Sequence, residues 1–245
     1  MGPPLGQSFG WGPNVRWPRA DSKLFSFTLN AAGPVVAVLH LQARDLASDE
    51  VSVSLNGAAQ GWLPPDTADV ATREVELVLS AREMKAGEPN QVIFDNVKNP
   101  PGTETWRIWN VWLEVVQMPK LSAEQLIEDA EADMQRGADA YELKDVAVGN
   151  LFKAWVNYRH AWLKLESLEP RPADPYDAAR ARLNELRPLL DAACNALVSK
   201  VQSQLTSADP KSAHATVEEM ALRFPTREHR CYDIALQYQQ DLNGL

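Results

Sequence analysis

The front of the chain alternates apolar and polar residues, and this period of two predicts β-strands. The clearest case is Val51-Ser-Val-Ser-Leu-Asn-Gly57, in which three apolar residues alternate with two serines before an Asn-Gly pair. Asn-Gly tolerates the positive φ angles of a tight turn, so this segment predicts a strand that ends in a turn. The alternation returns over Trp109, Val111, Leu113 and Val115, after a Pro-Pro-Gly break at 100–102.

Short segments of this kind recur at regular intervals, each bounded by Gly, Pro, Asn or Asp. Such spacing is typical of an antiparallel β-sandwich rather than of alternating strands and helices. An irregular Gly- and Pro-rich arm, 1–21, precedes them, and we expect it to pack along the sandwich through Trp11 and Trp17. The expected strands are 24–29, 35–43, 50–55, 73–79, 90–95 and 105–116.

The hydrophobic period changes after Met118-Pro119-Lys120. Apolar residues then recur three, four and seven positions apart, which indicates amphipathic helices. The first expected helix begins with a capping box made by Ser122 and Gln125. Further helices are expected over 150–169, 175–205, 210–223 and 227–242, with Pro188 at a kink or interruption and Thr226 as the last N-cap.

The sequence therefore predicts an α+β multidomain protein. Residues 1–118 form an antiparallel β-sandwich with its arm, and residues 121–245 form an all-α antiparallel helical bundle or short solenoid. We place the boundary at Pro119, because proline fits neither a paired central strand nor a helix interior.

The order of parts in the front half resembles the galactose-binding-like jelly-roll family. The resemblance rests on the strand that ends in Leu55-Asn-Gly57, the Gly61-Trp62 return, and Lys85-Ala-Gly-Glu-Pro-Asn-Gln-Val-Ile-Phe-Asp-Asn96, followed by a closing aromatic strand. It implies a jelly roll over about residues 20–117. Relatives include sugar-binding modules, structural domains of glycosidases and protein-binding domains, so the resemblance implies binding without choosing a ligand.

The back half resembles tetratricopeptide-type helical hairpins. Small residues face large ones in both of its first helices, and prolines close the helix pairs, although the helices exceed that repeat's 34-residue frame. Helical-hairpin arrays offer a concave surface for peptides or partner helices. The residues that carry this resemblance are Ala130, Gly137, Tyr141, Ala154, Tyr158 and Ala161.

Charge and hydropathy narrow the partners. The formal net charge is −9 and the pI is near 5.0, which argues against nucleic acid or an anionic membrane as the main partner. No run of 18 apolar residues occurs, so we expect no membrane insertion. The start, Met1-Gly-Pro-Pro-Leu-Gly, lacks the features of a signal peptide. We expect a cytoplasmic protein or a fragment of a larger one.

The two cysteines support the same location. Cys194 and Cys231 both fall in expected helices, and no Asn-x-Ser/Thr sequon occurs. We interpret them as small buried hydrophobic residues in a reducing compartment, with a disulfide between neighbouring helices as the main alternative. A zinc site built from Cys231, His214 and His229 would lack a fourth ligand at a defined spacing.

The motifs of catalysis are missing from the sequence. It contains no Gly-x-Ser-x-Gly elbow, phosphate-binding loop, His-Glu-x-x-His or dinucleotide fingerprint, so we expect no enzyme, no catalytic residues, no cofactor and no metal site. Calcium at Asp45, Asp49 and Glu50 is an alternative to a solvated acidic turn. His40 lies in an apolar strand and is interpreted as a hydrogen-bonded core or interface residue.

Three functions remain. The preferred one is a protein-interaction or adaptor module of a larger bacterial signalling or secretion assembly, partly because the Asp95–Asn110 segment resembles regions that follow forkhead-associated domains. On the closing strand, Trp106, Ile108 and Trp112 are expected to face away from the core and to contact the helices or a partner protein. The alternatives are a carbohydrate-binding module that uses Trp62, Asp66 and Asn99, with Trp106 beside them, and a structural subunit of a homo-oligomer.

Overall fold

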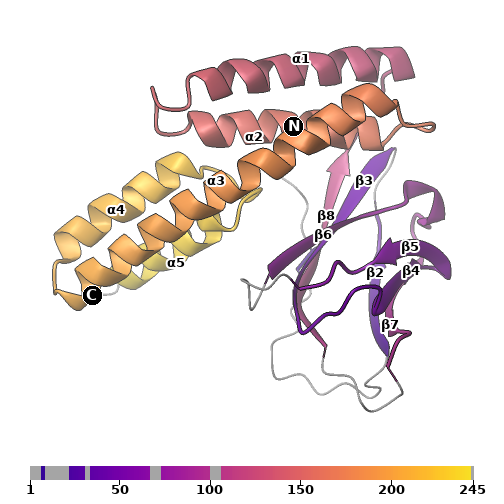
Figure 1. The fold of residues 1–245 in the computed structure, drawn as a ribbon, viewed down its shortest axis with the longest axis horizontal. Coiled ribbons are helices and arrows are strands. Elements are labelled where there is room, and N and C mark those ends of the chain that lie inside the picture. The colour runs from indigo at the N-terminus through magenta and orange to yellow at the C-terminus, as the bar shows by residue number, and fades with distance from the viewer. Residues whose placement is uncertain (1–6, 9–21, 31–33, 67–72, 100–105, 244–245) are drawn as a thin grey trace. The chain divides into compact units, whose positions relative to one another are not determined.

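A computed structural model describes residues 7–8, 22–30, 34–66, 73–99 and 106–243. The chain divides into two compact units, Met1–Lys120 and Leu121–Leu245, each with its own secondary structure (Figure 1). The first unit is an antiparallel β-sandwich and the second is entirely helical, as the alternation and the later change of period predict. Trp11 and Trp17, expected to pack on the sandwich, lie outside the described residues.

The sandwich consists of two four-stranded antiparallel sheets. The first sheet has the order β1-β8-β3-β6 and the second has the order β2-β7-β4-β5. The strands are β1 (Gln7–Ser8), β2 (Ser22–Thr28), β3 (Val35–Arg44), β4 (Val51–Leu55), β5 (Ala58–Trp62), β6 (Arg73–Leu79), β7 (Pro89–Asn96) and β8 (Arg107–Gln117), with a short 3-10 helix η1 (Ala81–Glu83).

The core of this unit lies between the inner faces of the two sheets. Phe25 and Phe94 enter it from the second sheet, and Leu39 and Leu113 enter it from the first. All four are buried, so the alternation that the sequence shows corresponds to one face of each strand packing against the opposite sheet.

The Asn-Gly pair and the segment before β7 are locked together. Asn56 and Gly57 adopt φ angles of 51° and 89°, as the tight turn between β4 and β5 requires. Asn90 is fully buried, and its Oδ1 accepts hydrogen bonds from the Lys85 backbone nitrogen at 2.7 Å and from Asn56 Nδ2 at 2.9 Å. These asparagines therefore fix the turn and the loop that precedes β7.

The helical unit contains α1 (Ala123–Glu142), α2 (Asn150–Glu166), α3 (Ala173–Thr206), α4 (Pro210–Arg223) and α5 (Cys231–Asn243). Helices α1 and α2 form a hairpin that packs against the N-terminal half of the long helix α3, and α4 and α5 lie along its C-terminal half (Figure 1). The capping box of α1 forms as expected, with Ser122 accepting from the backbone nitrogen of Gln125.

The structure decides between the alternatives for Pro188 only as far as an interruption is concerned, and it corrects the start of the last helix. Helix α3 continues through Pro188, so the proline does not interrupt it. Helix α5 begins at Cys231 and not after Thr226, because a turn occupies the intervening residues.

Candidate functional site

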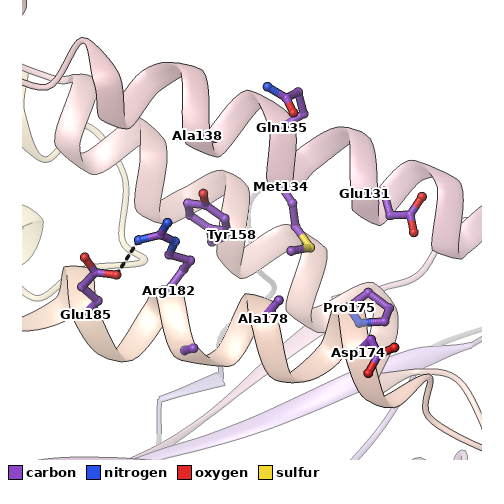
Figure 2. A pocket seen from close by; sticks show the side chains of 11 residues that line it. Glu131, Met134, Gln135, Ala138, Tyr158, Asp174, Pro175, Ala178, Arg182 and Glu185 are labelled. Atoms are coloured by element: carbon purple, nitrogen blue, oxygen red, sulfur yellow. Dashed lines mark hydrogen bonds and ion pairs between the residues drawn. The ribbon is translucent and has the colours of Figure 1, made fainter.

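The helical unit carries an open groove between α1 and the N-terminal part of α3, with α2 at its base. Its volume is about 680 Å³. Figure 2 shows Met134 pointing from α1 toward α3, and Arg182 reaching from α3 toward Tyr158. The groove is lined by Glu131, Met134, Gln135, Ala138, Tyr158, Asp174, Pro175, Ala178, Ala181, Arg182 and Glu185.

Close packing of α1 on α2 shapes the base of this groove. A Cβ added to Gly137 would lie 2.9 Å from the ring of Tyr158, so only glycine allows the ring this position. Tyr158 is buried, and this burial raises the pKa of its hydroxyl above the usual range, although the charge of Arg182 acts in the opposite direction. The ring thus forms an apolar floor between the two outer helices.

Carboxylates surround that floor. Arg182 Nη1 donates to Glu185 Oε2 at 2.6 Å, and this hydrogen bond raises the pKa of the guanidinium. Both groups are charged, and the pair has no net charge. Glu131 and Asp174 make no ion pair with another described residue, and both are exposed. The groove therefore combines small and apolar side chains with a net acidic rim.

A buried ionic cluster joins α1 to α2. Lys164 Nζ lies 2.5 Å from Asp129 Oδ2 and 2.5 Å from Asp133 Oδ2, and Arg136 also contacts Asp133. The ammonium of Lys164 and the carboxylate of Asp133 are both buried. Removing one partner of such a cluster leaves an uncompensated buried charge, so we regard the cluster as structural support for the helix pair.

The faces of β8 differ in part from the predicted ones. Trp106 and Ile108 are buried in the sandwich core, whereas Trp109 points to the outer face. The reason is a β-bulge: Gln42 pairs with Trp109 and His40 pairs with Trp112, so two residues of β8 oppose Leu41. Strict alternation across residues 106–115 fails because the bulge reverses the faces on either side of it.

Trp112 does lie on the outer face of the first sheet, as predicted, and its ring stacks on that of His40 with 3.8 Å between ring centroids. His40 Nε2 lies 2.8 Å from Glu114 Oε2, and its Nδ1 lies 3.6 Å from Glu76 Oε1. His40 is therefore a hydrogen-bonded residue on a sheet face.

The four residues considered for sugar binding have different roles. Asp66 Oδ2 accepts from the backbone nitrogen of Asp45 at 2.6 Å, and Asn99 Nδ2 donates to Glu50 Oε1 at 2.5 Å. Both side chains hold loops. Trp62 is 46% exposed on β5. Trp106, the fourth candidate, lies beneath Lys23, whose Nζ is 2.9 Å from the centre of the indole ring.

The acidic loop considered for calcium is held by protein donors. Glu50 Oε2 accepts from the Ala47 backbone nitrogen at 2.6 Å, and its Oε1 also accepts from Asn96 Nδ2 at 2.9 Å. Asp45 and Asp49 adopt positive φ angles of 61° and 53°. In the described part of the chain, no group of three or more His, Cys, Asp or Glu side chains could hold a metal ion.

The cysteines are paired, so their interpretation as separate hydrophobic residues is wrong. Cys194 on α3 and Cys231 on α5 form a disulfide with a Cα–Cα distance of 5.8 Å. Beside it, Arg230 Nη2 donates to Asn195 Oδ1 at 2.7 Å, and His229 Nε2 lies 3.3 Å from Asp191 Oδ1.

The described helices include none that is both long and apolar enough to cross a membrane.

The residues of the groove were not identified as a site from the sequence. Met134 and Tyr158 appear there only as apolar helix positions, and Asp174, Arg182 and Glu185 resemble any solvated helix face. The one available signal was the pairing of Gly137 and other small residues with large ones.

No protein-family model matches the sequence, and no curated protein matches it. Among solved structures, a match is found to the CBM51-2 and INT domains of ZmpB from Clostridium perfringens, with 9% sequence identity and a TM-score of 0.22. The match covers 67% of this chain and 34% of that chain, so this protein corresponds to about a third of the length of that structure.

Proposed function

We propose that this chain is a non-enzymatic protein-interaction module whose helical unit binds a segment of a partner protein in the groove between α1 and α3. The observation that carries the proposal is the groove itself, which is about 680 Å³ in volume and has an apolar floor beneath an acidic rim. Its walls are two helices that expose Ala178, Ala181 and part of Ala138, so a peptide backbone could approach closely.

The charges of the rim select the occupant. Glu131 and Asp174 give the rim its net negative charge, because the opposite charges of Arg182 and Glu185 cancel. A segment with Lys or Arg beside apolar side chains would pair with these carboxylates and cover Met134 and Tyr158. Attraction between exposed charges is screened by salt, so the affinity should fall as ionic strength rises.

This proposal places the chain in an adaptor role within a larger bacterial signalling or secretion assembly. The close contact of Gly137 with Tyr158 supports a tetratricopeptide-like helix pair, and the locked Asn56 and Asn90 support a galactose-binding-like sandwich. The disulfide removes the cysteine argument for a cytoplasmic location, because stable disulfides are typical of oxidising compartments. A homo-oligomeric subunit is the competing role, and sedimentation of the purified chain would reveal it.

An array of synthetic peptides tests the groove. We would probe the full chain against peptides that vary independently in basic and apolar content, and measure the best binders by calorimetry at low and high salt. The expected result is selective binding of basic, apolar peptides, with an affinity that the double variant E131K/D174K lowers at least tenfold.

The pair of changes Glu218→Lys and Asp241→Lys is the matched control, because together they make the same charge change at exposed positions of α4 and α5 outside the groove. It should leave the affinity unchanged. Equal binding by the parent chain and the double variant would show that the groove is not the site, and a failure of every peptide to bind would exclude peptide recognition.

A further inference from the structure

The turn between β4 and β5 holds the side-chain amide of Asn56 in one position. Asn56 Nδ2 donates to the Glu83 backbone oxygen at 2.6 Å and to Asn90 Oδ1 at 2.9 Å. Its Oδ1 accepts from the Gln91 backbone nitrogen at 3.0 Å, and its own backbone nitrogen donates to the Gln91 backbone oxygen at 2.8 Å. This one residue therefore bonds the turn to both η1 and β7.

Asn90 is the fixed side of this arrangement, which we call the asparagine lock. Asn90 is fully buried, and its Nδ2 donates to the backbone oxygens of Lys85 at 2.8 Å and Glu88 at 3.1 Å. Its Oδ1 accepts from the Lys85 backbone nitrogen and from Asn56 Nδ2. Both amide hydrogens and both lone pairs of Oδ1 are used, so the Asn90 amide holds that of Asn56 in a single orientation.

An asparagine that precedes glycine can modify itself without a cofactor. The Gly57 backbone nitrogen attacks Asn56 Cγ, the bond from Cγ to Nδ2 breaks, and Nδ2 leaves as ammonia together with the proton of the Gly57 nitrogen. Water then opens the resulting succinimide ring to aspartate or isoaspartate. Glycine favours the attack because it has no Cβ to shield its backbone nitrogen.

The asparagine lock opposes this reaction in the folded chain. Ring closure must draw Cγ onto the Gly57 nitrogen, and the departure of Nδ2 removes its hydrogen bonds to Glu83 and Asn90. Those two acceptors belong to other segments of the sandwich, so they do not follow the side chain as it moves. The unfolded chain has none of these bonds to lose, and its Asn56 is as reactive as any asparagine before glycine.

We propose that Asn56 is a site of spontaneous deamidation that the folded sandwich suppresses through Asn90, so that the modification marks chains that have unfolded. The product carries a carboxylate, which accepts hydrogen bonds but cannot donate them. In the lock it would face the Glu83 backbone oxygen and Asn90 Oδ1, which are also acceptors. A chain modified while unfolded cannot rebuild the lock, so unfolding becomes irreversible at this turn. This property belongs to the sandwich and does not depend on the groove of the helical unit.

A second Asn-Gly pair offers a comparison within the same molecule. Asn243 precedes Gly244 and is the exposed last residue of α5. Its side chain makes no hydrogen bond with another residue that the structure describes. The same dipeptide chemistry therefore occurs once inside the asparagine lock and once outside it.

Peptide mapping by mass spectrometry of the full chain tests the proposal. The chain would be incubated at mildly alkaline pH, both folded and in urea, and the deamidated fractions at Asn56 and Asn243 would be followed over time. We expect deamidation of Asn56 to be at least tenfold slower than that of Asn243 in the folded chain and to approach it in urea. Similar rates at Asn56 in the folded and unfolded chain would overturn the proposal.

Asn90→Ala should raise the rate at Asn56 in the folded chain at least fivefold and leave the rate at Asn243 unchanged. Val75→Ala is the matched control, because it removes buried apolar atoms from the first sheet without touching the lock. The two variants would be compared at urea concentrations that give equal fractions of unfolded chain. Equal rates at Asn56 would show that global unfolding, and not the lock, controls the reaction.

Asn56→Asp reproduces one of the two products and tests the claim of irreversibility. It should melt at a lower temperature than Asn56→Gly, which also tolerates the positive φ and loses the same hydrogen bonds but adds no carboxylate. If Asn56→Asp is as stable as the parent chain, the modified turn can re-form and the modification does not make unfolding irreversible.

Discussion

The ring of Tyr158 on α2 packs directly against the backbone of Gly137 on α1, where a Cβ would approach two ring carbons to 2.9 Å. This contact sets the separation of the two helices beneath the groove. Glycine is otherwise unfavourable inside a helix, by about 1 kcal/mol relative to alanine, so its presence in the interior of α1 has a packing reason.

The first prediction is that Gly137→Ala lowers the free energy of unfolding by about 1–2 kcal/mol. Helix propensity alone would stabilise the variant, but overpacking at Tyr158 costs about 1–3 kcal/mol. Urea unfolding of the parent and variant chains measures the difference. In the double variant G137A/Y158L the ring is absent, so the cost of the alanine should largely disappear. A single variant more stable than the parent would contradict the contact.

The second prediction concerns the bond between Cys194 and Cys231, which closes a loop over a sequence separation of 37. Loop-closure entropy assigns about 4 kcal/mol of stabilisation to a loop of this length. The double variant C194A/C231A should therefore melt at a lower temperature than the oxidised parent. Dithiothreitol should lower the melting temperature of the parent and leave that of the variant unchanged. Mass spectrometry of the unreduced protein that found two free thiols would contradict this pairing.

The third prediction follows from His160 on α2. Burial lowers the pKa of its imidazole because desolvation disfavours the charged form, although Asp133 and Glu228 act in the opposite direction. The unfolded chain, in which histidine titrates near pH 6.5, therefore binds the proton more readily. The corresponding stability is fully present above about pH 6.5 and is lost as the pH falls through the folded-state pKa.

Urea unfolding of the parent chain and of His160→Gln between pH 7.5 and 5 measures this effect. The parent should lose stability more steeply than the variant as the pH falls. Identical slopes would show that the protonation of His160 is not linked to folding.

The fourth prediction is that residues 1–120 and 121–245 fold separately. The sandwich core is built from both sheets of the first unit, and the helical unit has its own buried residues, among them Trp155, Trp162 and Leu186. Each fragment should give a circular dichroism spectrum of its own class and a cooperative melt. If both fragments are unfolded while the whole chain is folded, the two units share a core.

Regular periodicity made most of the fold predictable. The expected segments 73–79 and 210–223 have the same bounds as β6 and α4, because each begins and ends at a clear change of pattern. Strand β5 was not expected as a strand, since its sequence of two alanines, glutamine and glycine before Trp62 has low strand propensity. It forms because the Asn56-Gly57 turn returns it onto β4.

The sites were less predictable, because they depend on residues that the fold brings together. Trp62 was a candidate because of the resemblance to sugar-binding relatives, but its alignment with Asp95 and Ser22 follows only from strand register. The pairing of Cys194 with Cys231 depends on where α5 lies beside α3, and neither helix pattern contains that information. The groove likewise joins α1 to α3 across a complete helix.

The last prediction concerns Asn110, which creates the bulge in β8. Its φ is 49°, so it occupies the left-handed region that asparagine and glycine tolerate and β-branched residues disfavour. Asn110 Nδ2 also donates to Gln42 Oε1 at 2.7 Å. Asn110→Ile should therefore lower the free energy of unfolding by about 1–2 kcal/mol, whereas Asn110→Gly should cost much less.

Chemical unfolding of both variants, followed by tryptophan fluorescence, measures this difference. The two side chains that precede the bulge make the experiment specific. If isoleucine removed the bulge, the alternation would shift by one residue, and Trp106 and Ile108 would move to the outer face and become solvent-accessible. Fluorescence emission at longer wavelength in Asn110→Ile but not in Asn110→Gly would identify this shift. Equal stability of the two variants would instead show that residue 110 does not need a positive φ, and that the faces of β8 follow the simple alternation of the sequence.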